Sequence, residues 1–147
     1  IIHNISDVCL NISFNEGFGL ATLGSMQVGN PIIASKTGGL YRQVINYRDG
    51  TMNGIGLEPK LKTLVGSQNI PYIFEEYISC EDTAIALKNI YRLNDREKDK
   101  ISKKVELYVK EEFSYKKTIE LWHKSIQDVI DIHKIKKTQK SVRITNL

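Results

Sequence analysis

Residues 13–20 read Ser-Phe-Asn-Glu-Gly-Phe-Gly-Leu, and the patterns on either side of this stretch decide the fold. The run before it, 7–13, is apolar with β-branched residues and ends in turn formers, which is typical of a buried parallel strand. The run after it has apolar residues at helical spacing and a glycine, Gly29, at the expected helix C-cap. These patterns predict a strand, a glycine loop and a helix in succession.

The same order of elements repeats immediately along the chain. Residues 31–35 predict a second buried strand, 36–39 (Lys-Thr-Gly-Gly) a second glycine turn, and 40–45 a short helix. Residues 54–57 predict a third, short strand. Strand, glycine loop and helix in repetition indicate an α/β fold with a Rossmann-like parallel sheet, followed by C-terminal helices.

Helices are predicted for the last third of the chain, after an insertion at 60–76 that matches no regular pattern. Ser79, Asn94 and Ser114 stand at N-cap positions, the first with Asp82 in a capping box. The inward faces are expected to consist of Ala84, Leu87, Ile90 and Tyr91, then of Ile101, Val105 and Tyr108, and last of Tyr115, Ile119, Trp122, Ile126, Val129 and Ile130. We expect Tyr115 and Trp122 to pack in a core.

The composition predicts one globular domain that does not span a membrane. The 147 residues suffice for one core, and 41% hydrophobic with 26% charged residues excludes a disordered chain. No apolar run approaches the roughly 20 residues that a bilayer requires. Cys9 and Cys80 lack metal-ligand spacing and are expected to be buried thiols, which favours the cytoplasm. The start without Met favours a fragment of a larger protein.

The net charge of +4 is unevenly distributed. Residues 1–80 hold five Lys and Arg against six Asp and Glu, whereas 81–147 hold sixteen against eleven. We therefore expect a folded domain at 1–133 and a basic, disordered tail at 134–147. The tail leaves peripheral contact with an anionic membrane open as an alternative, and nucleic acid is not an expected partner.

Both glycine loops follow predicted strands directly, so they should lie at the same edge of the sheet, where open α/β sheets bind ligands. Gly17 and Gly19 permit close approach of a ligand to the backbone, and the next helix directs its unpaired N–H groups there. That arrangement favours a phosphate or pyrophosphate. Glu16 would repel a phosphate, but its carboxylate can accept hydrogen bonds from sugar hydroxyls. Together these features indicate a nucleotide sugar.

Three motifs, at 13–20, 29–35 (Gly-Asn-Pro-Ile-Ile-Ala-Ser) and 37–39 (Thr-Gly-Gly), resemble the donor-binding half of GT-B glycosyltransferases of the family 4 type, also called glycosyl transferases group 1. Residues 112–115 resemble the family's closing Phe-Ser-Trp helix. The resemblance covers most of 5–130, and the insertion is loosely similar to glycosyltransferases of large DNA viruses. The resemblance to the GT-B family implies a retaining hexosyltransferase of carbohydrate biosynthesis that needs no cofactor and no essential metal.

The resemblance implies a role for each matching residue. Glu16 would act in catalysis, contacting the donor sugar's hydroxyls and stabilising the positive charge that develops on the sugar. The donor-binding residues would be Gly17, Phe18, Gly19 and Leu20, through their backbone amides, together with Gly24, Gly38 and Gly39. The acceptor, a glycan, lipid or protein, would bind to an N-terminal GT-B domain that this chain lacks.

One position departs from the family pattern. A second glutamate, eight positions after the first, binds the ribose hydroxyls in the family, and this sequence has Gly24 there. Losing such a charge-assisted hydrogen bond would weaken nucleotide binding by roughly 1.5–3 kcal/mol. Three explanations stay open: another residue replaces the glutamate, the donor is not a standard nucleotide sugar, or the domain is an inactive binding scaffold.

Two other functions of GT-B proteins are alternatives to glycosyl transfer. A sugar-nucleotide epimerase stays open as an alternative, whereas a phosphorylase would need a lysine that binds pyridoxal phosphate, and no sequence context suggests one. Lys36 is expected to be an exposed loop lysine. No role is expected for the histidines, which are His3, His123 and His133.

Overall fold

The computed structural model describes residues 2–144, and side chains as far as residue 136. The described chain divides after Lys110 into two compact units. The elements in chain order are η1 (Ile2–Ile5), β1 (Cys9–Asn11), α1 (Leu20–Gln27), β2 (Ile32–Ser35), α2 (Leu40–Val44), β3 (Gly54–Leu57), β4 (Leu61–Ser67), β5 (Ile70–Tyr77), α3 (Cys80–Tyr91), α4 (Asp95–Glu112) and α5 (Tyr115–Ile144).

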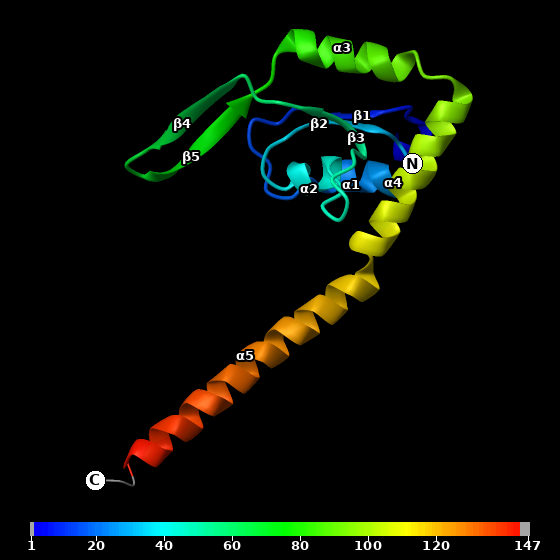
Figure 1. The fold of residues 1–147 in the computed structure, drawn as a ribbon. Helices are drawn as coiled ribbons and strands as arrows, with labels where there is room; N and C mark the ends of the chain where they lie inside the picture. The colour runs from blue at the N-terminus through cyan, green and yellow to red at the C-terminus, as the bar shows by residue number, and fades with distance from the viewer. Residues whose placement is uncertain (1, 145–147) are drawn as a thin grey trace. The chain divides into compact units, whose positions relative to one another are not determined.

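The first unit has the α/β fold that the sequence predicts. Its parallel sheet has the strand order β1-β2-β3 (Figure 1), with α1 and α2 against one face and α3 against the other. The central strand, β2, is buried at all four positions. Because side chains alternate along a strand, Ile33 packs toward α3 with Leu57, Ala86 and Ile90, whereas Ile32 points to the opposite face.

The repeated strand–loop–helix order of the first half is confirmed, with small shifts at the ends of elements. The first strand is shorter than predicted, since it keeps only Cys9–Asn11. The C-cap of α1 is Val28, and Gly29 follows it at φ +81°, the left-handed conformation that glycine adopts readily after a helix. The third predicted strand is β3.

The expectation of an irregular insertion at 60–76 is wrong. Strands β4 and β5 pair antiparallel as a hairpin, which leaves the sheet at the carboxyl end of β3 (Figure 1). The pairing shifts register between Val65 and Ser67, where Gly66 has φ +145°. The sequence of β4, Leu-Lys-Thr-Leu-Val-Gly-Ser, does not alternate polar and apolar residues even before this bulge, so no strand pattern marks it.

The N-cap of α3 is confirmed, whereas only Ile90 of its predicted inward face is buried. Ser79 Oγ accepts a hydrogen bond from the Asp82 amide at 3.0 Å, as a capping box requires. The buried residues of α3 are Thr83, Ala86 and Ile90. The other predicted face residues are exposed, namely Ala84, Leu87 and Tyr91. The helix approaches the sheet through its smaller side chains, which apolar spacing alone does not reveal.

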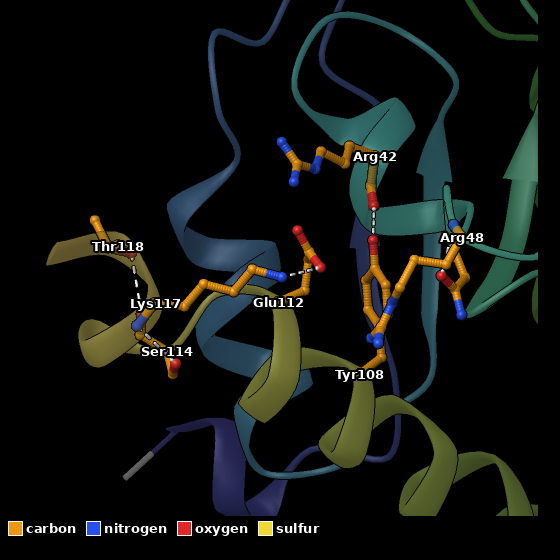
Figure 2. Close-up of polar contacts among 8 residues, drawn as sticks. Arg42, Arg48, Tyr108, Glu112, Ser114, Lys117 and Thr118 are labelled. Carbon is orange, nitrogen blue, oxygen red and sulfur yellow. Dashed lines mark hydrogen bonds and ion pairs between the residues drawn. The ribbon is translucent and has the colours of Figure 1, made fainter. Parts of the chain in front are cut away.

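Asn94 caps helix α4 as predicted, and two of the three predicted inward residues are buried, whereas Ile101 is only partly buried. Asn94 Oδ1 accepts from the Glu97 amide at 3.0 Å, and Glu97 Oε2 accepts from the Asn94 amide at 2.9 Å. Val105 and Tyr108 are buried. Figure 2 shows that the Tyr108 hydroxyl donates to the backbone carbonyl of Arg42, at 2.8 Å. This bond ties α4 to α2.

The second unit consists mainly of α5, capped as predicted by Ser114, whose Oγ accepts from the Lys117 amide at 3.2 Å (Figure 2). The expectation that Tyr115 and Trp122 pack in a core is wrong, because they are 83% and 66% exposed. The remaining residues of the predicted stripe are also exposed: Ile119, Ile126, Val129 and Ile130. The spacing of apolar residues shows which side of a helix is apolar. It does not show whether another part of the protein packs against that side.

The predicted tail, 134–147, is described only in part. The backbone of α5 continues to Ile144, but side chains from 137 onward and residues 145–147 lie outside the described part of the chain. The boundary at residue 133 therefore stays a prediction. Within the described residues, no helix combines the length and the apolar character needed to cross a bilayer.

Candidate functional site

The two glycine loops meet at the carboxyl edge of the sheet, as the sequence predicts. The Gly39 amide donates to the Glu16 carbonyl at 3.0 Å. A Cβ on Gly38 would overlap that same carbonyl, and one on Gly39 would overlap the backbone of Phe18. Since only glycine allows this approach, the second loop packs its backbone directly on the first.

Helix α1 begins beside this contact. Gly19 occupies its N-cap with φ +88° and, lacking a side chain, offers no capping oxygen. The first turn of a helix leaves its amides without partners inside the helix, and the helix dipole makes this end favourable for an anion. The loop itself is shaped by Asn11, whose Oδ1 accepts from the Ser13 amide and whose Nδ2 donates to Thr22 of α1.

The side chain of Gln43, in α2, bonds to the backbone of the same loop. The sequence did not point to this residue. Its buried side-chain Nε2 donates to the carbonyls of Phe18, at 2.6 Å, and Gly19, at 3.1 Å. The backbone carbonyl of Gln43 accepts from Asn53 Nδ2 at 3.0 Å. A polar residue among the apolar residues of a short helix is the signal that could have identified Gln43. A side-chain amide that is buried in a protein normally has a hydrogen-bond partner, and that partner is often the backbone.

The predicted loop residues differ in how tightly they are constrained. The Glu16 side chain is half-buried, and Phe18 and Leu20 are exposed. A Cβ on Gly17 would meet open space, so packing does not require glycine there. Space beside the Gly17 backbone is consistent with close approach of a ligand.

Lys36 differs from its expected exposure. Only 19% of its side chain is accessible, and its ammonium pairs with the Glu58 carboxylate just after β3. The pair joins the carboxyl ends of β2 and β3, next to the second glycine loop. Cys80 also departs from prediction, since its thiol is exposed and Cys9 is partly so.

Gly24, the position of the family's second glutamate, lies in α1 and faces the N-terminal segment. A Cβ there would lie 3.2 Å from Nε2 of His3 and 3.5 Å from its Cδ2. His3 therefore occupies the space beside this glycine. A Cβ at this position would need the His3 side chain to move by a few tenths of an ångström.

The base of the β4–β5 hairpin contacts the first glycine loop. No sequence pattern indicated this contact. The rings of Phe14 and Tyr77 lie 4.3 Å apart, and Asn15 Nδ2 donates to the Phe74 carbonyl at 3.2 Å. The Glu76 amide donates to the Phe14 carbonyl at 2.8 Å. The insertion thus contributes to the candidate site through its base.

Other parts of the first unit are less suited to chemistry. A cavity of about 440 Å³ lies near the amino end of β3, against α3 and α4, away from the glycine loops. Asn53 is one of the residues that line it, and the Oδ1 of this residue has no hydrogen-bond partner among the described residues. The described residues hold no group of three or more His, Cys, Asp or Glu that could bind a metal ion.

Comparison with known proteins adds no further constraint. No protein-family model matches the chain, and no curated protein matches it.

Proposed function

We propose that the chain is the donor-binding half of a glycosyltransferase, which moves a hexosyl group from a nucleotide-diphosphate sugar to an acceptor with retention of configuration. The observation that carries this proposal is the contact between the Gly39 amide and the Glu16 carbonyl. It brings the two glycine loops and the start of α1 to one place on the carboxyl edge, where α/β sheets bind nucleotides.

The chemistry of the loops supports a sugar donor over a bare nucleotide. The amides at the start of α1 suit a pyrophosphate, and the adjoining Glu16 carboxylate suits hydroxyl groups that donate hydrogen bonds. In the transfer step, the bond between the anomeric carbon and the pyrophosphate oxygen breaks as the oxygen of the acceptor hydroxyl bonds to that carbon, and the proton of this hydroxyl passes to the departing pyrophosphate. Glu16 would stabilise the positive charge on the sugar, and the amides the negative charge on the leaving pyrophosphate.

A complete transferase also needs an acceptor site. The acceptor, a glycan, lipid or protein, would bind to an N-terminal GT-B domain in the same protein. Free thiols at Cys9 and Cys80 favour the reducing conditions of the cytoplasm. No cofactor beyond the donor itself is invoked.

The test is calorimetric titration of the intact protein with UDP, GDP, ADP and their sugar conjugates. One nucleotide should bind selectively, and its affinity should rise with the correct sugar. The Glu16→Gln variant should lose most of the affinity that the sugar adds, so that it binds the nucleotide sugar about tenfold or more weakly than wild type. Its affinity for the nucleoside diphosphate alone should persist. The matched control is Glu81→Gln, the same change at an exposed position of α3. A folded protein that binds none of these compounds would contradict the proposal.

A second candidate, a binding scaffold that has lost catalysis, is favoured by Gly24 and the neighbouring His3. Gly24→Glu combined with His3→Ala restores a carboxylate and gives it room, since His3 is the nearest obstacle. If the site is a weakened nucleotide site, the double variant should bind nucleoside diphosphate about tenfold or more tightly than His3→Ala alone. Equal affinities would favour the scaffold.

A further inference from the structure

Glu76, on the hairpin, contacts both glycine loops. Its backbone amide donates to the Phe14 carbonyl in the first loop, at 2.8 Å. Its carboxylate accepts a hydrogen bond from the Thr37 side chain in the second loop. A single residue of the insertion therefore links the two segments that form the candidate donor site.

The surroundings of Glu76 hold its carboxylate in place. Lys62, directly opposite on β4, pairs with Glu76 at 2.9 Å, and its ammonium also lies 4.9 Å from the centre of the Phe74 ring. The Glu76 side chain is 18% exposed, and Thr37 is buried. A hydrogen bond to an ionised carboxylate is stronger than one between two neutral groups.

The hairpin base is joined to the site through further contacts. The Phe14–Tyr77 ring contact and the bond from Asn15 to the Phe74 carbonyl hold the first loop on the side facing the hairpin. The second loop also holds it, through the bond from the Gly39 amide to the Glu16 carbonyl. The first loop is therefore bonded both to the hairpin and to the second loop.

We propose that Glu76 is a positioning residue, through which the β4–β5 hairpin holds the two glycine loops in the geometry that binds the donor. This inference rests on the proposed function for the identity of the ligand. The positioning itself concerns contacts that exist without ligand, and it can be measured directly. The side chain of Glu76 acts through Thr37, and it is not itself a catalytic group.

The first arm of the test follows amide hydrogen exchange in the ligand-free protein by NMR. Glu76→Ala and Thr37→Val should each speed exchange of the Gly39 amide about tenfold, without a similar change at Ile33 in the central strand. Glu76→Gln keeps an oxygen that can accept from Thr37 and should restore most of the protection. The double variant Glu76→Ala/Thr37→Val should be no faster than either single variant, because both remove one bond.

The control is Gln68→Glu, which exchanges the same two functional groups in the exposed turn of the hairpin, away from both loops. It should leave Gly39 exchange unchanged. The inference is overturned if folded Glu76→Ala protein retains wild-type exchange at Gly39, or if the control alters it equally.

The second arm measures the affinity for the nucleotide sugar that the titration panel selects. Glu76→Ala should weaken binding about tenfold, with Glu76→Gln close to wild type. If wild-type protein binds no member of the panel, the proposed function fails and the donor role of Glu76 fails with it. If wild type binds a donor and Glu76→Ala binds it equally well, the positioning role alone is overturned.

Discussion

At the scale of single residues, the glycines of the site differ in whether a larger side chain would fit. Some have no room for a Cβ, whereas others face open space. Gly39→Ala should destabilise the fold by about 1–3 kcal/mol, because its Cβ would overlap Phe18 backbone, which cannot move as a flexible side chain can. Gly17→Ala, in the same loop cluster, should stay within about 0.5 kcal/mol, since its Cβ meets open space. Urea denaturation of both variants measures the difference, and equal losses would mean that the loops are not packed as described.

The same comparison shows how far residue patterns predict the site. The sequence predicted that Gly17, Gly19, Gly38 and Gly39 would gather at one edge, because each loop follows a strand of the same parallel sheet. It did not predict Gln43, since the bond from its side chain to the loop backbone links segments that sequence spacing does not relate. Contacts of this kind depend on the completed fold.

At the scale of elements, the hairpin should respond to acid through Glu76. Hydrogen bonds from Thr37 and then from Lys62, together with the charge of Lys62, lower the pKa of the Glu76 carboxyl below its ordinary value of 4.5. The folded state therefore favours the ionised form more than the unfolded chain does. This contribution to stability is fully present above pH 4.5 and is lost as the pH falls through the lowered pKa.

Comparison of wild type with Glu76→Gln isolates this contribution, because glutamine does not titrate. The difference between their unfolding free energies should be constant at neutral pH and should shrink as the pH falls below 4.5. Urea denaturation at several pH values measures it. A difference that stays the same through the acid range would show that the carboxylate gains nothing from its partners in the folded state.

The hairpin also marks the limit of prediction at this scale. Strands β2 and β3 were recognisable because parallel strands in the middle of a domain are short apolar runs between glycine turns. Strands β4 and β5 carry Gly66 and Pro71, and most of their residues are exposed, so their pattern lacks one clearly apolar face. Pairing between the two strands, which the sequence does not display, decides their structure.

At the scale of the molecule, the two units differ in what stabilises them. The first has a buried core around the sheet, with Ile32, Ile33 and Ala34 inaccessible to solvent. In the second, the apolar side of α5 from Tyr115 to Ile130 is exposed. Because tertiary packing supplies most of the stability of protein helices, a helix without it approaches the marginal stability of an isolated peptide.

Hydrogen exchange should therefore separate the two units in the intact chain. Amides of β2 should exchange only through global unfolding, whereas those of α5 between Ile119 and Val129 should exchange at least about 100-fold faster through local opening. NMR at several protein concentrations measures both sets, with Ile33 as the internal reference. Equal protection at low concentration would show that the aromatic side of α5 is covered by residues of its own chain. Protection of α5 that rises with concentration would show that a second copy covers it, and sedimentation would then detect a dimer.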